Sequence, residues 1–308
     1  MVDLKSFGNK EMKLAPGHRL CPGCAAPIIS KLVLLAASDY DVVVGTATGC
    51  LEVSTTIYPY TAWKVPWIHN AFENVAATIS GVETAYRVLK KKGKINKNIK
   101  FIAIGGDGGT YDIGLQSLSG ALERGHNFLY ICYDNEGYMN TGIQRSSATP
   151  IGASTTTDPA GTVRPGKLEF RKDLTAIVAA HHIPYVAQAS IHNLNDFLTK
   201  VKIAIETEGP SFINVLSPCV LGWGYDSSQT IELAKLAVET CFWPLYEVKN
   251  DNWILNYDPG DKKKPVIEFM KSQKRFKHLF KPENEWVLKR AQEEVDKRWE
   301  WLKRMCEK

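Results

Sequence analysis

Short apolar runs alternate with longer amphipathic segments along the first two thirds of the chain. Five of these runs predict buried strands, at residues 40–45, 100–105, 128–133, 185–189 and 212–216. The intervening segments carry apolar residues at steps of three or four and predict helices, at residues 27–37, 71–89, 112–124, 174–181 and 194–206. This alternation is typical of an α/β fold, a doubly wound and mostly parallel sheet with helices on both faces.

Two stretches depart from this alternation. Residues 138–168 form a long segment rich in Thr, Gly, Pro and Ser, and loops of this length inside a compact domain are usually functional. After residue 220, scattered tryptophans, glycines and prolines predict an irregular region that ends in an amphipathic helix over 282–305. We therefore expect an α/β domain over 1–220 and an extension over 221–308 that packs on this domain or on partner subunits.

Composition and charge describe an ordinary globular protein. The 308 residues are 44% hydrophobic and 23% charged. No apolar run reaches the roughly 18 residues of a membrane span, and the N-terminus lacks the apolar core of a signal peptide. We therefore expect a cytoplasmic protein that does not bind a membrane. The net charge of the chain is +5, and residues 261–308 alone carry +6. Acids are interspersed there, which favours a solvated helix over a nucleic-acid surface.

The first candidate functional residues follow two of the predicted strands. Gly106, Asp107 and Gly108 follow one apolar run, and Asn135 follows the next one, 28 residues after Asp107. Neighbouring strands of a parallel sheet end side by side, in the crevice where such folds bind ligands. The oxygens of Asp107 and Asn135 are suited to one Mg²⁺, which often bridges to phosphate, and glycines let a diphosphate approach the backbone. This spacing resembles the thiamine diphosphate motif, although a plain tight turn at 105–106 is the simpler alternative.

Cysteines supply a second candidate site. Their number, seven, is odd and disfavours a disulfide framework. Cys21 and Cys24 form a CxxC pair, whereas Cys50 and Cys219 each follow a predicted strand. If the sheet is parallel, these four thiols lie at the same edge as Asp107. They would suit a [4Fe–4S] cluster or a structural zinc, and unligated thiols remain open. We interpret the remaining three as structural thiols: Cys132, Cys241 and Cys306.

Six motifs together resemble one known family, the β subunits of 2-oxoacid:ferredoxin oxidoreductases. They are GHRLCPGC at 17–24, ATGCLEV at 47–53, YPYTAW at 58–63, WIHNAFEN at 67–74, GGDGGTYDIG at 105–114 and YDNEGYMNTGIQ at 133–144. The resemblance covers most of residues 15–220 and is strongest to the separate β chains of multi-subunit pyruvate enzymes. Two departures are Ala25, where many relatives have a third glycine, and the Ser-Pro context of Cys219.

The resemblance implies roles for particular residues. Mg²⁺ would be bound by the side chains of Asp107 and Asn135 and by the Gly137 carbonyl. A [4Fe–4S] cluster would be bound by Cys21, Cys24, Cys50 and Cys219. Asn140 would lie at the reacting carbon, with Asp112 as a weaker catalytic candidate. The expected coenzyme-binding set is Gly49, Gly106, Asp107, Gly108, Gly109, Thr110, Asn135, Gly137, Tyr138, Met139 and Asn140.

The resemblance also implies a reaction and partners. It implies oxidative decarboxylation of a 2-oxoacid, with pyruvate as first choice, electrons passed through the cluster to ferredoxin, and the acyl group passed to CoA. Partner chains of the α, γ and δ type would complete the complex, and one of them would supply the glutamate that activates thiamine. Alternatives are another 2-oxoacid (oxalate, 2-oxoglutarate or a branched-chain acid), a non-oxidative thiamine decarboxylase with structural zinc, and a scaffold chain. Dinucleotide binding is disfavoured because the glycine segment 105–109 lacks the GxGxxG arrangement.

Overall fold

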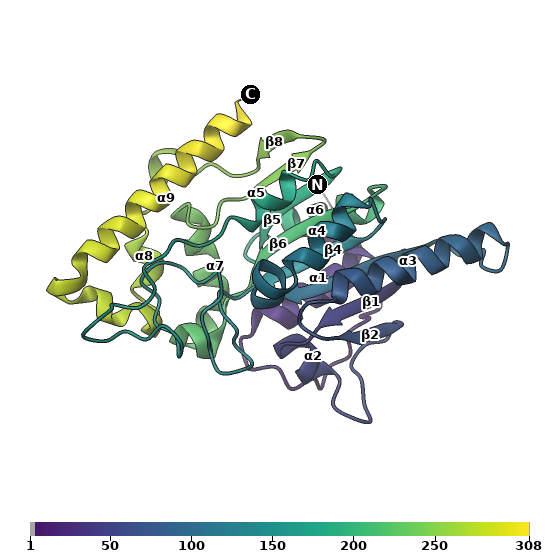
Figure 1. The fold of residues 1–308 in the computed structure, drawn as a ribbon, viewed down its shortest axis with the longest axis horizontal. Coiled ribbons are helices and arrows are strands. Elements are labelled where there is room, and N and C mark those ends of the chain that lie inside the picture. Colours follow the sequence, from purple (N-terminus) through teal and green to yellow (C-terminus); the bar gives the residue numbers. More distant parts are fainter. Residues whose placement is uncertain (1–3, 308) are drawn as a thin grey trace.

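The computed structural model describes residues 4–307. Within these residues the chain forms one eight-stranded sheet with the strand order β2-β1-β3-β4-β6-β5-β7-β8. Helices cover both faces of this sheet, and the long helix α9 lies on the opposite side of the molecule from the projecting end of α3 (Figure 1). The strands are β1 Asp41–Ala47, β2 Trp67–Asn70, β3 Ile99–Gly106, β4 Leu129–Asp134, β5 Tyr185–Ser190, β6 Ser211–Leu216, β7 Tyr246–Lys249 and β8 Asn252–Leu255.

Strand direction determines where the candidate site residues meet. Strands β1 to β6 pair in parallel, whereas β7 and β8 join antiparallel at one edge of the sheet. In the register of β3 and β4, Gly106 lies opposite Tyr133, and Asp134 lies opposite Leu216 of β6. The carboxyl ends of β3, β4 and β6 therefore lie side by side, as the parallel sheet predicted from the sequence requires.

Alternating strand residues build a core on each face of the sheet. In β3, Phe101 and Ala103 belong to one buried cluster, and Ile102 and Ile104 belong to the other. Helices α3, α4, α5 and α9 pack into the first cluster, and α1 and α6 pack into the second. The helices are α1 Ala25–Ala36, α2 Cys50–Thr55, α3 Val75–Lys91, α4 Leu115–Glu123, α5 Leu174–Ala179, α6 Leu194–Glu206, α7 Thr230–Glu239, α8 Ile267–Met270 and α9 Glu285–Cys306.

The predicted doubly wound fold is confirmed, and the starts of two predicted helices are corrected. The helix expected over 71–89 is α3, which begins at Val75. The five predicted strands are all present, with ends shifted by one or two residues. The helix expected over 112–124 begins only at Leu115, because the segment before it forms a wide turn of π-helix over Gly108–Ile113. Gly114 permits the change: a Cβ on Gly114 would lie 2.0 Å from the carbonyl oxygen of Gly109, so the backbone passes too closely for any side chain.

The C-terminal extension is more regular than expected. It contributes α7 and the edge strands β7 and β8, which continue the sheet, before it ends in the predicted amphipathic helix. Helix α9 buries Val287, Ala291, Val295, Trp299 and Leu302 along one side. The interspersed charges expected here form ion pairs, including Lys264 with Glu239 at 2.8 Å.

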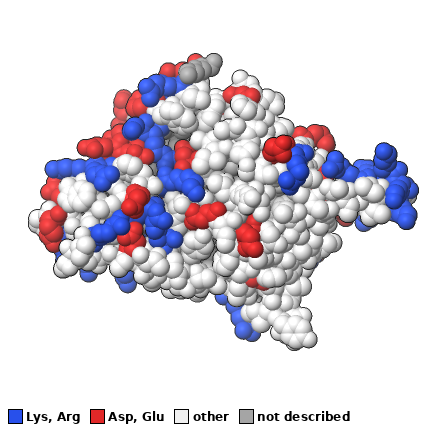
Figure 2. Space-filling model, in the orientation of Figure 1, with Lys and Arg blue, Asp and Glu red and all other residues white. Residues whose placement is uncertain are grey.

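Charged side chains gather in two places on the face shown in Figure 2. Lysines and arginines cluster at the outer end of α3, and acids and bases mix over α8 and α9. In residues 4–307 no helix is both long and apolar enough to cross a membrane.

Candidate functional site

Two cavities open where the parallel strands end. The first, here called the glycine cleft, has a volume of about 30 Å³. Eleven of the predicted site residues line it: Gly49, Cys50, Gly106, Asp107, Gly108, Gly109, Asn135, Gly137, Tyr138, Met139 and Asn140. The second, here called the cysteine cavity, has a volume of about 290 Å³. Its walls include all four cysteines predicted to act together: Cys21, Cys24, Cys50 and Cys219.

Three oxygen-bearing groups converge in the glycine cleft. The Asp107 carboxylate is fully buried, and it accepts hydrogen bonds from the Asn135 backbone N–H at 3.2 Å and from the Ser146 hydroxyl at 2.5 Å. One terminal atom of the Asn135 side-chain amide lies 2.8 Å from Asp107 Oδ1 and 2.8 Å from the Gly137 carbonyl oxygen. Without a metal, the amide NH2 group at that position donates to both oxygens. With a divalent cation bound, the amide would turn its oxygen inward, and three oxygens would then form the donor set of a hard cation.

The electrostatics of the cleft agree with that donor set. Burial raises the pKa of the Asp107 carboxyl well above its ordinary value, and the nearby Asp134 carboxylate raises it further. An anion in this position is therefore costly unless a positive charge lies close to it. A cation between the three oxygens would supply that charge.

Close packing shapes the glycine turn. A Cβ on Gly108 would lie 2.3 Å from the aromatic ring of Tyr138, so only glycine fits under this ring. The Tyr138 hydroxyl donates to the Gly108 carbonyl oxygen at 2.9 Å. The loop after β4 is thereby fastened to the loop after β3.

Burial controls the state of the thiols. It raises the pKa of Cys24 to about 12 and that of Cys219 to about 11, and it also raises the pKa of Cys50. The Asn140 side chain opposes this rise by a hydrogen bond to Cys50, and the Gly222 N–H donates to the Cys219 sulfur at 3.3 Å. All seven cysteines of the chain are free, and among residues 4–307 no three His, Cys, Asp or Glu side chains are arranged to hold a single metal ion.

The two cavities share one wall. Cys50, Asn135, Met139 and Asn140 line both of them. Gly222 lines the cysteine cavity and packs against this wall: a Cβ on Gly222 would lie 2.2 Å from the Met139 sulfur, so only glycine fits there. A ligand in the glycine cleft and a group bound by the cysteines would therefore be neighbours.

Two predicted residues line neither cavity. The Thr110 hydroxyl donates to the Gly106 carbonyl oxygen at 2.7 Å and lies 3.0 Å from the Tyr130 hydroxyl, beneath the glycine turn. Asp112 accepts from the Ser147 N–H at 3.0 Å. In the structure both side chains brace the loops around the cleft, and their roles toward coenzyme and substrate stay predictions.

Sequence reasoning missed several residues that hold the cleft together. Ser146 lies in the long loop and has no motif that ties it to Asp107. Trp223 donates from its indole N–H to the Asn135 carbonyl oxygen at 2.8 Å. Glu136, buried between two cleft residues, is held by arginines from distant segments. No local pattern announces these contacts, because each joins segments far apart in the chain.

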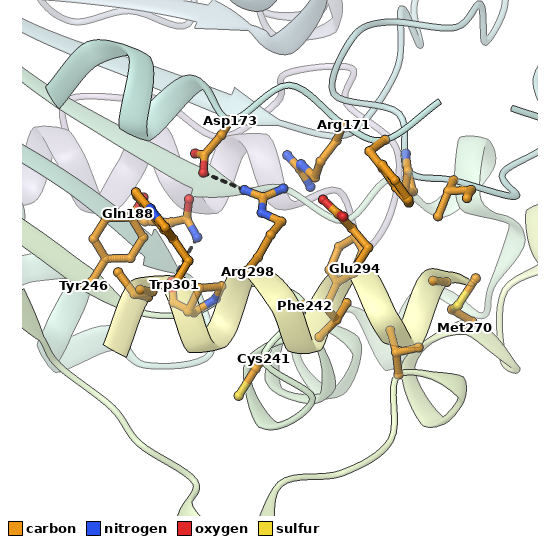
Figure 3. Close-up of a pocket in the computed structure, with 18 residues that line it drawn as sticks. Arg171, Asp173, Gln188, Cys241, Phe242, Tyr246, Met270, Glu294, Arg298 and Trp301 are labelled. Atoms are coloured by element: carbon orange, nitrogen blue, oxygen red, sulfur yellow. Dashed lines mark hydrogen bonds and ion pairs between the residues drawn. The ribbon is translucent and has the colours of Figure 1, made fainter. Parts of the chain in front are cut away.

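A third cavity, of about 50 Å³, lies under α9 and shares no lining residue with the other two. Figure 3 shows Arg298 of α9 pointing toward Asp173, and these side chains pair at 2.9 Å. Burial raises the pKa of the Glu294 carboxyl, which lines the same cavity. The walls are otherwise largely apolar, so this space is a packing feature of the extension.

The chain belongs to the thiamine diphosphate-binding enzymes by its match to a family model, with which the parallel sheet and the strand-end cleft agree. Residues 46–215 match the family model described as thiamine pyrophosphate enzyme, C-terminal TPP binding domain. The chain belongs to the family of 2-oxoacid:ferredoxin oxidoreductase β subunits, as its curated relatives establish.

Those relatives match nearly the whole chain. It is 57% identical to pyruvate synthase subunit PorB of Thermotoga maritima, over 97% of this chain and 93% of the relative. It is 45% identical to ketoisovalerate oxidoreductase subunit VorB of Pyrococcus abyssi, over 94% of this chain and 92% of the relative. Among solved structures, 2-oxoglutarate:ferredoxin oxidoreductase from Magnetococcus marinus shares the fold, with a TM-score of 0.57 and 21% identity over 74% of this chain and 81% of that chain.

Proposed function

We propose that this chain is the coenzyme-binding β subunit of a pyruvate synthase. In this proposal, pyruvate is oxidatively decarboxylated, electrons leave through a [4Fe–4S] cluster to ferredoxin, and the acyl group passes to CoA. The observation that carries the proposal is the shared wall: Cys50, Asn135, Met139 and Asn140 line both cavities. Such a wall suits a reaction in which a coenzyme hands electrons directly to a neighbouring cluster.

The glycine cleft fits thiamine diphosphate with Mg²⁺. Asp107, Asn135 and the Gly137 carbonyl would hold the metal, because the Asn135 side-chain amide lies 2.8 Å from both Asp107 Oδ1 and the Gly137 carbonyl oxygen. The backbone of Gly106, Gly108 and Gly109 lines the cleft, next to the place where the diphosphate would lie. When bound, the coenzyme supplies an electron sink for decarboxylation. The chain itself contributes placement, with Tyr138 fastening the two loops and Asn140 standing at the wall next to Cys50.

The cysteine cavity fits an iron–sulfur cluster. Four thiols line a space of about 290 Å³, which accommodates a group much larger than one metal ion. A single zinc would draw its thiolates in to roughly 2.3 Å from one point. The size of the cavity therefore favours a [4Fe–4S] cluster over structural zinc. Cys219 is supported as the fourth ligand by its place in the same wall as the other three cysteines.

Partner chains complete the proposed enzyme. Subunits of the α, γ and δ type would carry the thiamine-activating glutamate, further substrate-binding groups and the route to ferredoxin. Two relatives named pyruvate synthase subunit are 57% and 58% identical to this chain, against 45% for the ketoisovalerate relative, which favours pyruvate as substrate. The ketoisovalerate relative makes a branched-chain 2-oxoacid the second candidate.

The decisive experiment reconstitutes the complete complex anaerobically and measures ferredoxin reduction with a panel of 2-oxoacids, with and without CoA. We expect the highest kcat/KM with pyruvate, dependence on CoA, and iron rather than zinc bound by this chain. Release of an aldehyde without ferredoxin reduction would instead identify a non-oxidative decarboxylase. A higher kcat/KM with a branched-chain acid would reassign the substrate and keep the reaction.

A further inference from the structure

Glu136 occupies an unusual position between the two cleft residues Asn135 and Gly137. Its backbone has a φ of 66°, in the left-handed region that costs a residue with a side chain about 1–2 kcal/mol. Its side chain is buried, with 0% exposure. This backbone conformation turns the Glu136 carboxylate into the core, while the Asn135 side-chain amide lies 2.8 Å from both Asp107 Oδ1 and the Gly137 carbonyl oxygen. Something in the core must hold the carboxylate there.

Two buried arginines hold it. Glu136 Oε1 accepts from Arg171 at 2.7 Å, and Glu136 Oε2 accepts from Arg275 at 2.5 Å. Arg171 also donates to the Asp134 carboxylate at 2.5 Å and to the Tyr111 hydroxyl at 3.0 Å. The four charged side chains are at most 8% exposed, and two carboxylates balance two guanidinium groups. Removing either arginine would leave a buried anion short of a partner.

Arg275 differs from Arg171 because it reaches the cleft by two routes. It comes from the 3₁₀ segment Lys274–Phe280 in the C-terminal extension, 139 residues from Glu136. Its guanidinium lies 4.0 Å from the centre of the Trp223 ring, and the indole N–H of Trp223 donates to the Asn135 carbonyl oxygen. One side chain thus restrains Glu136 directly and Asn135 through the indole.

We propose that Arg275 is a positioning residue for the metal-binding segment 135–137. It sets the direction of the Asn135 amide and the Gly137 carbonyl by holding Glu136 and Trp223, and it touches neither metal nor coenzyme. The inference rests on the proposed function, since it assumes that the oxygens of this segment bind Mg²⁺. It assigns to the extension a role in coenzyme binding that its sequence does not suggest.

The test measures binding in the assembled complex, apart from turnover. Mn²⁺ replaces Mg²⁺ as the probe, and electron paramagnetic resonance gives its affinity in the presence of thiamine diphosphate. Groups that orient metal ligands from the outer shell typically change metal affinity by about 10- to 100-fold, so Arg275→Met should weaken Mn²⁺ binding by that amount. Arg275→Lys keeps the charge but loses the planar fork, and it should recover part of the loss.

Arg298→Met is the matched control. Arg298 is also an arginine of the extension in a pair with a carboxylate, Asp173, at 2.9 Å, and neither residue lines the glycine cleft. We expect Mn²⁺ affinity within about twofold of wild type, since a partly exposed pair contributes little. An equal loss in both methionine variants would overturn the proposal, because general destabilisation would then account for it.

Asp107→Asn distinguishes a failure of the positioning role from a failure of the proposed function. If Asp107→Asn loses Mn²⁺ and coenzyme binding while Arg275→Met binds as wild type does, the positioning role is refuted and the proposed function stands. If Asp107→Asn also binds normally, the proposed function itself fails.

Trp223→Phe keeps the test decisive if Arg275→Met does not assemble. It retains a ring under Arg275 but removes the N–H that donates to Asn135, so affinity should fall about three- to tenfold, as for one hydrogen bond. Unchanged affinity in both Trp223→Phe and Arg275→Lys would refute the proposal.

Discussion

The strand ends of the sheet and the C-terminal extension serve the candidate site in opposite ways. At the strand ends, the groups that face one another come from a short stretch of chain, Asp107 to Gly137, and their chemistry is visible in the residue types. The extension adds Trp223 and Arg275, which act on Asn135 and Glu136 from 88 and 139 residues away. Candidate metal ligands can therefore lie close together in the sequence, while the side chains that orient them come from distant parts of the chain.

We expect the greatest loss of coenzyme affinity from a substitution at the strand ends. Asp107→Ala removes a carboxylate whose oxygens face Asn135 and Ser146. We expect affinity for thiamine diphosphate with Mg²⁺ to fall more than about 100-fold, beyond the loss typical of outer-shell changes. Calorimetry measures the affinity, and the visible spectrum and iron content should be retained. Loss of the cluster with normal coenzyme affinity would contradict the assignment.

Cys50→Ala tests the wall between the two cavities. The thiol lies at the start of α2 and lines both spaces, so its removal should eliminate the iron–sulfur cluster. Iron analysis and the loss of visible absorbance measure this, while coenzyme affinity should stay within about tenfold, the lower end of outer-shell effects. Ferredoxin reduction should disappear even if some decarboxylation survives. An unchanged iron content would show that Cys50 is not a ligand.

The strand ends were predictable because their signals are local. An apolar run followed by Gly-Asp-Gly, and a second run followed by Asn135, are readable without any knowledge of the tertiary structure. Parallel pairing then brings them together, because β3 and β4 end at one edge. The four cysteines follow the same logic, since Cys50 and Cys219 each come shortly after a strand.

Other features of the site and the fold could not be predicted, because they depend on contacts between segments far apart in the sequence. Arg275 sits in a segment dense in lysine and arginine that reads as a solvated face, yet it is 6% exposed because the distant Glu136 neutralises it. The short strand Tyr246–Lys249 alternates too briefly to distinguish it from a loop, and only pairing with β5 makes it a strand. Thr110 and Asp112 share the glycine motif, but the π-helical turn directs their side chains to Tyr130 and Ser147.

Trp299→Ala tests whether general destabilisation of the C-terminal extension affects coenzyme binding. Trp299 of α9 is 4% exposed within the core cluster, so its truncation should lower the free energy of unfolding by about 3–5 kcal/mol. Trp299 lines neither the glycine cleft nor the cysteine cavity, so coenzyme affinity in the folded protein should change little. Denaturant unfolding and calorimetry measure the two quantities. A loss of affinity like that expected for Arg275→Met would mean that the whole extension, rather than one arginine, aims the ligands.

The smallest expected effect concerns the long loop that lies between these two regions. Lys167 is fully buried and donates to the Thr149 carbonyl oxygen. Burial and, to a smaller extent, the charges of Arg145 and Arg171 together lower the pKa of its ammonium group from 10.5 to about 8. Between pH 8 and 10.5 the unfolded chain therefore holds a proton at this residue that the folded chain has largely released.

The sign of the pH dependence follows from that difference. Because the unfolded state binds more protons in this window, the contribution of Lys167 to the free energy of unfolding rises with pH, by about 1 kcal/mol per pH unit. Lys167→Met has no such group, so the stability of wild type relative to the variant should increase from pH 8 to pH 10. Denaturant unfolding at several pH values measures it, and the subtraction cancels other titrating groups. If the unfolding free energies of the two proteins instead change with pH in parallel, Lys167 keeps its ordinary pKa in the folded protein. The long loop would then hold this lysine in a solvated environment, as an exposed loop does.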